Sequence, residues 1–296
     1  MKKEQFVIDN ETYVLSKDKN KKNVTNKQIH DIILLIFLEI DRICRKNNIP
    51  YALSFGSALG LYNYGGFIPW DDDGDIVIDY FDYPHLVESL KNDLGEQFAF
   101  ECYEVNHKYN ALIPPIKVRF KGSYCKERNH IFLPNRANIS NGLFVDICTF
   151  MGVPENKKEH QKLINKNFMR MIPYVFFDAL LGITPKKLQR KIKNDEEKNA
   201  KKYIDSDYVS QTTRIPFQAH PKKIVKNLSF PKNVIYPFKE YDFIGHKLFS
   251  FCNIEEFCRL RYGEESLKKF RYNQYIDEYR NKHKIKAHHF LEIDIF

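Results

Sequence analysis

The fold is decided by residues 51–80, which read YALSFGSALGLYNYGGFIPWDDDGDIVIDY. The stretch opens with an apolar run, residues 51–55, whose composition is typical of a β-strand. A small-residue turn follows at Gly56 and Ser57, and residues 58–61 are suited to starting a helix. Residues 75–79 alternate polar and apolar side chains, which is the period of a strand with one buried face. The stretch therefore predicts a strand, a turn, a short helix, a second turn and a strand.

Acidic residues crowd the start of the second strand. Asp71, Asp73 and Asp75 are two residues apart, so an extended chain would project them to the same side. Three like charges repel one another unless a cation lies between them. Mg²⁺ binds carboxylate oxygens together with substrate phosphates, so these acids are candidate ligands for Mg²⁺ or Mn²⁺. The competing interpretation is a solvated acidic turn, against which stand the adjoining Trp70 and the apolar strand that follows.

The turn at Gly56 and Ser57 offers what a phosphate group needs. It supplies backbone N–H groups that no Cβ shields at the glycine, a hydroxyl, and the N-terminus of the following helix. A phosphate-binding turn beside metal-binding acids predicts phosphoryl or nucleotidyl transfer.

Two further strands carry charged residues. Residues 142–147 read GLFVDI, and a single acid such as Asp146 in an apolar strand is costly unless it is paired, hydrogen-bonded or bound to a metal. An edge-strand Asp bonded to a backbone N–H is the alternative to a metal-bound or paired acid. Residues 116–120 place Lys117 and Arg119 on one strand face, where exposed basic residues are commonly just solvated.

These motifs resemble known proteins. Gly56-Ser57 followed by Asp73-x-Asp75 is similar to the signature of the nucleotidyltransferase superfamily with the polymerase-β-like fold. The longer string Gly-Ser-x-Leu-Gly … Gly-Phe-Ile-Pro-Trp-Asp-Asp-Asp-x-Asp resembles the LicD/fukutin family. The resemblance extends from about residue 28 to about residue 275 and is sharpest at 67–75 and 142–147. It implies an α+β fold with a mixed sheet, packed helices and a C-terminal helical portion.

The resemblance also implies an activity. Members of the family transfer a phospho-alcohol, such as phosphocholine or ribitol phosphate, from a CDP-linked donor to a glycan. Carried over by position, the catalytic acids are Asp73, Asp75 and Asp146, and Asp71 joins these three as a metal ligand. The substrate-binding residues are Gly56, Ser57, Trp70, Lys117 and Arg119.

Two departures from the family pattern leave the transferred alcohol open between choline, ribitol, glycerol and an aminoethylphosphonate. Asn63 and Tyr64 stand where an Arg-His pair is common, and Gly74 stands where an aliphatic residue is usual. Two other functions use the same residues differently. A nucleotidyltransferase would attach NMP to a small molecule, protein or RNA, and a non-catalytic module would bind nucleotide or glycan without reaction.

Composition fits this interpretation. The chain has 296 residues and 47 Lys and Arg against 38 Asp and Glu, a net charge of +9 that favours anionic partners. Its six cysteines have no C-x-x-C spacing of a zinc site, and several lie in apolar segments, where reduced thiols are usual; this favours a cytoplasmic protein. We expect no secretory signal and no membrane span, with room for peripheral contact at the inner membrane face and a lipid-linked glycan acceptor. Nucleic acid is not an expected partner, because the charged run 186–202 has few interleaved aromatic residues.

The rest of the chain is divided by its local patterns. We expect an N-terminal arm at 1–23, a catalytic core at 24–153 and a mixed C-terminal part at 154–296. Predicted helices cover 26–47 behind the N-cap Thr25, 84–94, two or three segments of 154–208 broken near Pro173 and 184–185, and 254–262 between Asn253 and Gly263. Predicted strands cover 98–105, 116–120 and 243–249. A loop at 122–141 and the tail, in positions where they could border substrate, contain the basic residues Arg128, His130, Arg136, His283, His288 and His289.

Overall fold

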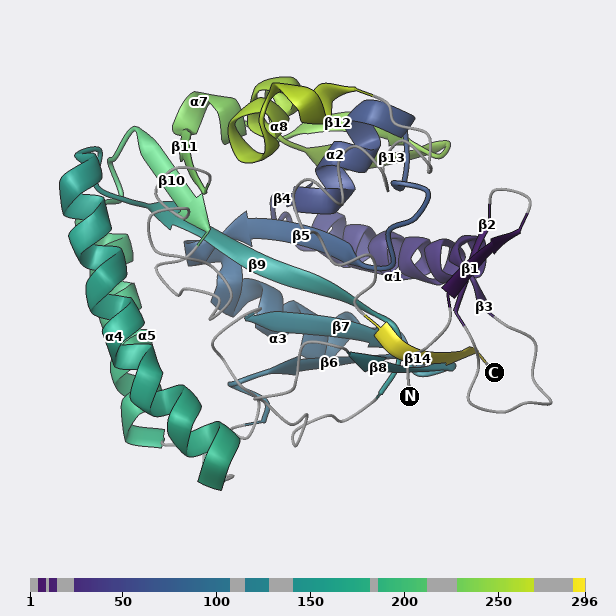
Figure 1. Ribbon diagram of the computed structural model, residues 1–296. Helices are drawn as coiled ribbons and strands as arrows, with labels where there is room; N and C mark the ends of the chain where they lie inside the picture. The colour runs from purple at the N-terminus through teal and green to yellow at the C-terminus, as the bar shows by residue number, and fades with distance from the viewer. Residues whose placement is uncertain are drawn as a thin grey trace.

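The computed structural model describes residues 5–8, 11–14, 24–106, 115–127, 141–181, 186–211, 228–268 and 290–295. Its centre is a mixed sheet flanked by helices, as the sequence predicts (Figure 1). Among these residues, none of the helices combines the length and the apolar character needed to cross a bilayer. All six cysteines are free thiols.

The strand β9 (Phe144–Gly152) organises the sheet. One edge of β9 runs parallel to β5 (Gly74–Asp79). Its other edge pairs antiparallel with β7 (Ile116–Phe120) along the first half and with β10 (Tyr208–Gln211) along the second. The sheet is completed by β4 (Tyr51–Leu53), β6 (Phe98–Cys102), β11 (Ser229–Pro231), β12 (Lys239–Phe243) and β13 (His246–Ser250).

Several shorter elements lie around this sheet. A second sheet contains β1 (Gln5–Ile8), β2 (Glu11–Val14) and β3 (Val24–Thr25), and a third pairs β8 (Ser123–Glu127) with β14 (Phe290–Ile295). The helices are α1 (Asn26–Lys46), α2 (Phe55–Tyr64), α3 (Tyr83–Asp93), α4 (Lys157–Leu181), α5 (Lys186–Lys202), α7 (Lys232–Ile235) and α8 (Ile254–Tyr262), with 3₁₀ turns η1 (Tyr80–Asp82) and η2 (Glu264–Leu267).

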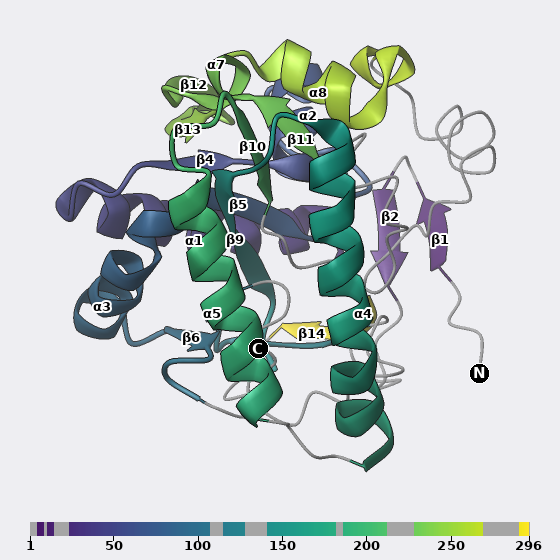
Figure 2. The ribbon, with the colours of Figure 1, turned by 90° about the vertical axis from the view of Figure 1, so that its left-hand side faces the viewer.

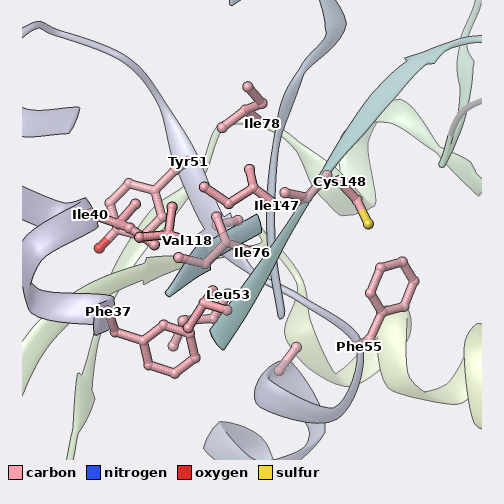
Figure 3. Close-up of a cluster of buried hydrophobic side chains, with 14 of the residues drawn as sticks. Phe37, Ile40, Tyr51, Leu53, Phe55, Ile76, Ile78, Val118, Ile147 and Cys148 are labelled. Atoms are coloured by element: carbon pink, nitrogen blue, oxygen red, sulfur yellow. The ribbon is translucent and has the colours of Figure 1, made fainter. Parts of the chain in front are cut away.

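Helix α1 covers one face of the sheet. It begins at a capping box, in which the Thr25 side chain accepts the N–H of Gln28 and the Gln28 side chain accepts the N–H of Thr25. The predicted apolar stripe is buried along the whole helix. Figure 3 shows Phe37 and Ile40 of α1 beside Ile76 of the sheet, with Cys148 and Phe55 on the opposite side. The opposite face carries α2 and α8 (Figure 1).

Gly74 is explained by this packing. A Cβ at position 74 would lie 2.6 Å from Ile33 and 2.8 Å from Phe37, both on α1. The glycine therefore lets α1 approach the start of β5 closely, where the family pattern has an aliphatic residue. The glycine at position 74 is therefore explained by the packing of α1 on β5, not by the loop of acids.

Four local predictions are corrected. Gly56 and Ser57 lie inside the first turn of α2, not in a separate turn before it. Helix α4 continues through Pro173, where we expect a break, and residues 184–185 are outside the described residues. The predicted loop 122–141 contains the strand β8, which pairs with β14 in the tail. Strand β6 ends at Cys102, three residues before the predicted end.

Candidate functional site

Three adjacent strands bring charged side chains to one point of the sheet. In the parallel pair of β5 and β9, Asp75 lies directly opposite Asp146. In the antiparallel pair of β7 and β9, Lys117 lies opposite the same Asp146. Residues that pair across strands project from the same face of a sheet. Asp75, Asp146 and Lys117 therefore share the face that also carries α2 and α8.

Lys117 is the counter-charge of this row. Its ammonium Nζ lies 3.2 Å from Asp146 Oδ1, and the side chain is 5% exposed while that of Asp146 is 24% exposed. The ammonium also lies 3.2 Å from the centre of the Phe144 ring, an arrangement in which the ring quadrupole favours a cation. Desolvation of this kind strengthens a charge pair relative to one in water. Asp146 is thus fixed toward the site, with one carboxylate edge facing Lys117.

Three further carboxylates converge just before β5. Asp71, Asp72 and Asp73 each offer an oxygen such that all three oxygens lie within 4.8 Å of one another. Asp72 is fully buried. Strand alternation does not predict that Asp72 joins Asp71 and Asp73, because neighbouring side chains of an extended chain point to opposite sides. Residues 71–73 precede the strand, which begins only at Gly74, so the alternation does not apply to them.

The first turn of α2 is built against these acids. Ser57 Oγ accepts the backbone N–H of Asp75 at 3.0 Å, and the N–H of Ser54 donates to the Asp75 carbonyl at 3.0 Å. A Cβ at Gly56 would lie 2.7 Å from Asp71 Oδ2, a separation that real Cβ atoms do not show. The glycine thus allows the Asp71 carboxylate to lie against the backbone of α2. Phe55, which opens the helix, adopts a left-handed φ of 45°, a strained conformation of the kind that accumulates at functional sites.

Helix α1 holds the loop of acids from the other side. Asn26 donates from Nδ2 to the Pro69 carbonyl at 3.0 Å, and the His30 ring nitrogen Nε2 lies 2.7 Å from the Asp71 carbonyl. The His30 ring stacks on Phe67 with centroids 4.4 Å apart. Burial lowers the pKa of His30, and Asp72 opposes that shift. The neutral ring donates its Nε2 proton to the carbonyl, so the loop is anchored without a further charge.

Arg119 and Trp70, predicted to bind substrate, lie deeper than expected. The Arg119 side chain is 2% exposed, donates from Nε to Glu101 at 2.9 Å and donates from NH1 to the Gly142 carbonyl at 2.9 Å. Trp70 is buried and meets Tyr64 edge to face with centroids 6.0 Å apart. These contacts give both side chains a supporting position beneath the acids.

The two residues that replace the Arg-His pair also have structural contacts. Asn63 donates from Nδ2 to the Ser266 carbonyl at 2.8 Å and so joins α2 to η2. Tyr64 packs on Trp70. Neither supplies a cation to the site.

A cation from the C-terminal part of the chain lies beside the first residue of α2. Arg261, near the end of α8, places its guanidinium carbon 5.7 Å from the centre of the Phe55 ring, next to Gly56. Its Nε is buried and has no hydrogen-bond partner among the described residues. The adjacent Tyr262 lies near the acids: burial raises its pKa, Arg261 lowers it, and the charges of Asp75 and Asp71 raise it further. From the sequence, Arg261 is predicted only to lie near a helix end, because 186 residues separate it from Asp75.

Some predicted contributors cannot be placed. Arg128, His130, Arg136, His283, His288 and His289 lie outside the described residues. The described site therefore consists of the acids, Lys117, the first turn of α2 and the end of α8.

Comparison with known proteins agrees with the resemblance drawn from the motifs. Residues 48–180 match the family described as LicD/FKTN/FKRP, nucleotidyltransferase domain. The chain is 25% identical to the lipopolysaccharide cholinephosphotransferase LicD of Haemophilus influenzae over 151 residues. This aligned segment covers 49% of this chain and 52% of that protein. The match thus spans about half of the length of this relative. The family match at residues 48–180 includes every acid of the site, and over this segment the chain is similar to the LicD family.

Proposed function

We propose that the chain transfers phosphocholine or a related phospho-alcohol from a CDP-activated donor to a glycan acceptor. The observation that carries the proposal is the alignment of Asp75 and Asp146 on adjacent strands, beside the converging acids 71–73 and the first turn of α2. The cholinephosphotransferase relative supports the phosphocholine part. A polymerase-β-like form of the mixed sheet and a cytoplasmic location belong to the same proposal.

The acids suit a hard divalent cation. Oxygens of Asp71, Asp72 and Asp73 lie within 4.8 Å of one another, and carboxylate oxygens are the donors that Mg²⁺ or Mn²⁺ prefers; Asp75 and Asp146 lie on the neighbouring strands, outside that cluster. We assign Asp71, Asp73, Asp75 and Asp146 as its ligands and add Asp72. When bound, such an ion would neutralise the diphosphate of the donor and the charge that develops on the leaving CMP.

The protein groups then have separate tasks. The N-terminal turn of α2, with Gly56 and Ser57, faces the donor diphosphate with backbone N–H groups. Arg261 supplies the phosphate-binding cation that Asn63 and Tyr64 do not. Asp146 orients the acceptor hydroxyl and takes its proton, while Lys117 holds this carboxylate in place. Phosphoryl transfer depends mainly on such positioning and charge stabilisation.

The donor is tested with a panel of CDP-choline, CDP-ribitol, CDP-glycerol and CDP-ethanolamine in Mg²⁺ or Mn²⁺. We expect CMP release with at least one donor, its loss on addition of EDTA, and a rise in melting temperature with the same donor. Release of pyrophosphate from an NTP, with no response to any CDP-alcohol, would favour the alternative nucleotidyltransferase.

Arg261 is tested by Arg261→Gln with the best donor. A charged hydrogen bond to phosphate is worth about 1.5–3 kcal/mol, so we expect KM for the donor to rise by roughly 10-fold to 100-fold. Arg259→Gln is the matched control on the same helix, because Arg259 is held in ion pairs with Glu255, Glu256 and Glu264. An equal KM for the two variants would remove Arg261 from the donor site.

A further inference from the structure

The positive charge of the chain is concentrated in one structural unit. Residues 157–202, which form the hairpin of α4 and α5, contain 13 Lys and Arg against 5 Asp and Glu, a net charge of +8. The other 250 residues have 34 Lys and Arg against 33 Asp and Glu. The overall charge of +9 is therefore a local property of the α4–α5 hairpin, not a general surface feature.

The hairpin stands along one side of the molecule. Figures 1 and 2 show α4 and α5 side by side at that edge, away from α1 and from the β1–β2 hairpin. Each helix turns a separate stripe inward. On α4, His160 and Ile164 are buried, and on α5, Gln189, Glu196 and Ala200 are buried. The opposite faces of both helices are accordingly left to solvent.

The exposed face of α4 is basic in its first half and apolar farther along the helix. Lys158, Lys162, Lys166, Met169 and Ile172 are all exposed, and their spacing of three or four residues places them on one helix face. The three lysines form no ion pair with any residue that the structure describes. They are followed, toward the C-terminal end of α4, by Met169 at 64% exposure and Ile172 at 40%.

We propose that this face of the α4–α5 hairpin docks on an anionic lipid surface. Unpaired lysines in line with exposed apolar side chains fit a membrane interface, where lysines meet lipid phosphates and apolar side chains enter the boundary of the acyl chains. A nucleic acid would satisfy the lysines but would leave Met169 and Ile172 without a partner. The proposal goes beyond transferase activity and does not depend on it, because docking needs neither donor nor metal.

Co-sedimentation of the full chain with vesicles tests the proposal. We expect binding to vesicles of phosphatidylcholine with 30% phosphatidylglycerol, weak binding to pure phosphatidylcholine, and loss of binding in 1 M salt, where the Debye length falls to about 3 Å. Lys158→Gln/Lys162→Gln/Lys166→Gln should weaken binding on the order of 100-fold, since each lysine near an anionic surface changes binding roughly fivefold. Met169→Ser/Ile172→Ser should also weaken binding at low salt, because it removes the apolar part of the contact.

A matched control removes three exposed lysines elsewhere. Lys239→Gln/Lys247→Gln/Lys268→Gln changes the net charge equally and should bind vesicles as the parent chain does. Melting temperatures of all variants verify that they fold. Equal losses in the two lysine triples would reduce the effect to net charge and overturn the proposal. Preferential binding of a single-stranded oligonucleotide, or self-association without vesicles that the hairpin variants abolish, would assign the face to another partner.

Discussion

At the scale of single residues, the site depends on how closely backbone and carboxylates approach. Gly56 has no Cβ, and Asp71 Oδ2 occupies the space next to it. The hydroxyl of Ser57 is already bonded to the N–H of Asp75, so its first task is to fix the acids. The Gly-Ser pair thus begins the helix and also positions the acids: Gly56 leaves room for the Asp71 carboxylate, and Ser57 binds the backbone of Asp75.

The substitution Gly56→Ala tests this close approach. The new methyl group would displace the Asp71 carboxylate, and we expect CMP release to fall at least about tenfold. Stability should not fall in parallel, because alanine favours a helix over glycine by about 1 kcal/mol. CMP release and thermal melting of the purified variant measure the two effects.

Gly95→Ala is the control for this substitution. Its nearest neighbour would be the end of the Glu39 side chain at 3.3 Å, far along the chain from the acids. Unchanged activity in Gly56→Ala would show that Asp71 does not need its present position.

Sequence reasoning found the acids that strand periodicity or family motifs reveal. Asp73, Asp75 and Asp146 follow from those patterns, and the strand register aligns Asp75 with Asp146 as the prediction requires. Asp72 was missed because the chain is not extended there. Arg261 was missed because it comes from a distant helix, and only tertiary packing places it beside Phe55.

At the scale of elements, a buried ion pair joins β6 to β7 beneath the site. Glu101 and the Arg119 side chain are almost completely buried, with Nε and Oε2 2.9 Å apart. Replacing Glu101 with Gln leaves the guanidinium without its counter-charge. We expect the free energy of unfolding in urea to fall by about 3–5 kcal/mol.

The double variant Glu101→Leu/Arg119→Met is the control for the ion pair. Apolar replacement of both partners removes the uncompensated charge and should cost less than Glu101→Gln alone. A larger loss in the double variant would mean that Arg119 acts mainly through the Gly142 carbonyl.

Helix α4 carries a buried histidine on its inward stripe. Burial lowers the pKa of His160 from 6.5 to about 4. Between these values the unfolded chain binds a proton that the folded chain does not, so stability falls as pH falls through this window. Between pH 7 and pH 5 we expect this residue to lower the free energy of unfolding by about 2 kcal/mol.

Urea denaturation at pH 7 and pH 5 measures the contribution of His160. The variant His160→Gln should lose this part of the pH dependence, whereas the exposed His85→Gln should keep it. The same loss between the two pH values in His160→Gln and the parent chain would contradict the assignment.

Element boundaries could be predicted where one local signal dominates. Thr25, Asn253 and Gly263 cap their helices as expected, because capping depends on a few neighbouring residues. Strand β8 and its partner β14 were not predicted, since that pairing joins residues more than 160 positions apart. The predicted break at Pro173 was wrong: α4 continues through this proline.

At the scale of the whole molecule, distant segments complete one sheet. Strand β10 extends the edge of β9 beyond β7, and β13 joins the sheet through Ser250 opposite Leu53. The family match ends at residue 180, yet α8 packs on α2 and brings Arg261 to the site. The C-terminal part therefore contributes to the same structural unit as the acids.

The decisive measurement of the acid site is CMP release from CDP-choline in Mg²⁺ by Asp75→Asn and Asp146→Asn, with the exposed Asp205→Asn as control. We predict that both site variants fold and lose at least about 1000-fold in rate, because each removes a charge that holds the metal and the reacting groups. Asp205→Asn should keep full activity. Parent-level activity in either site variant would contradict the central claim.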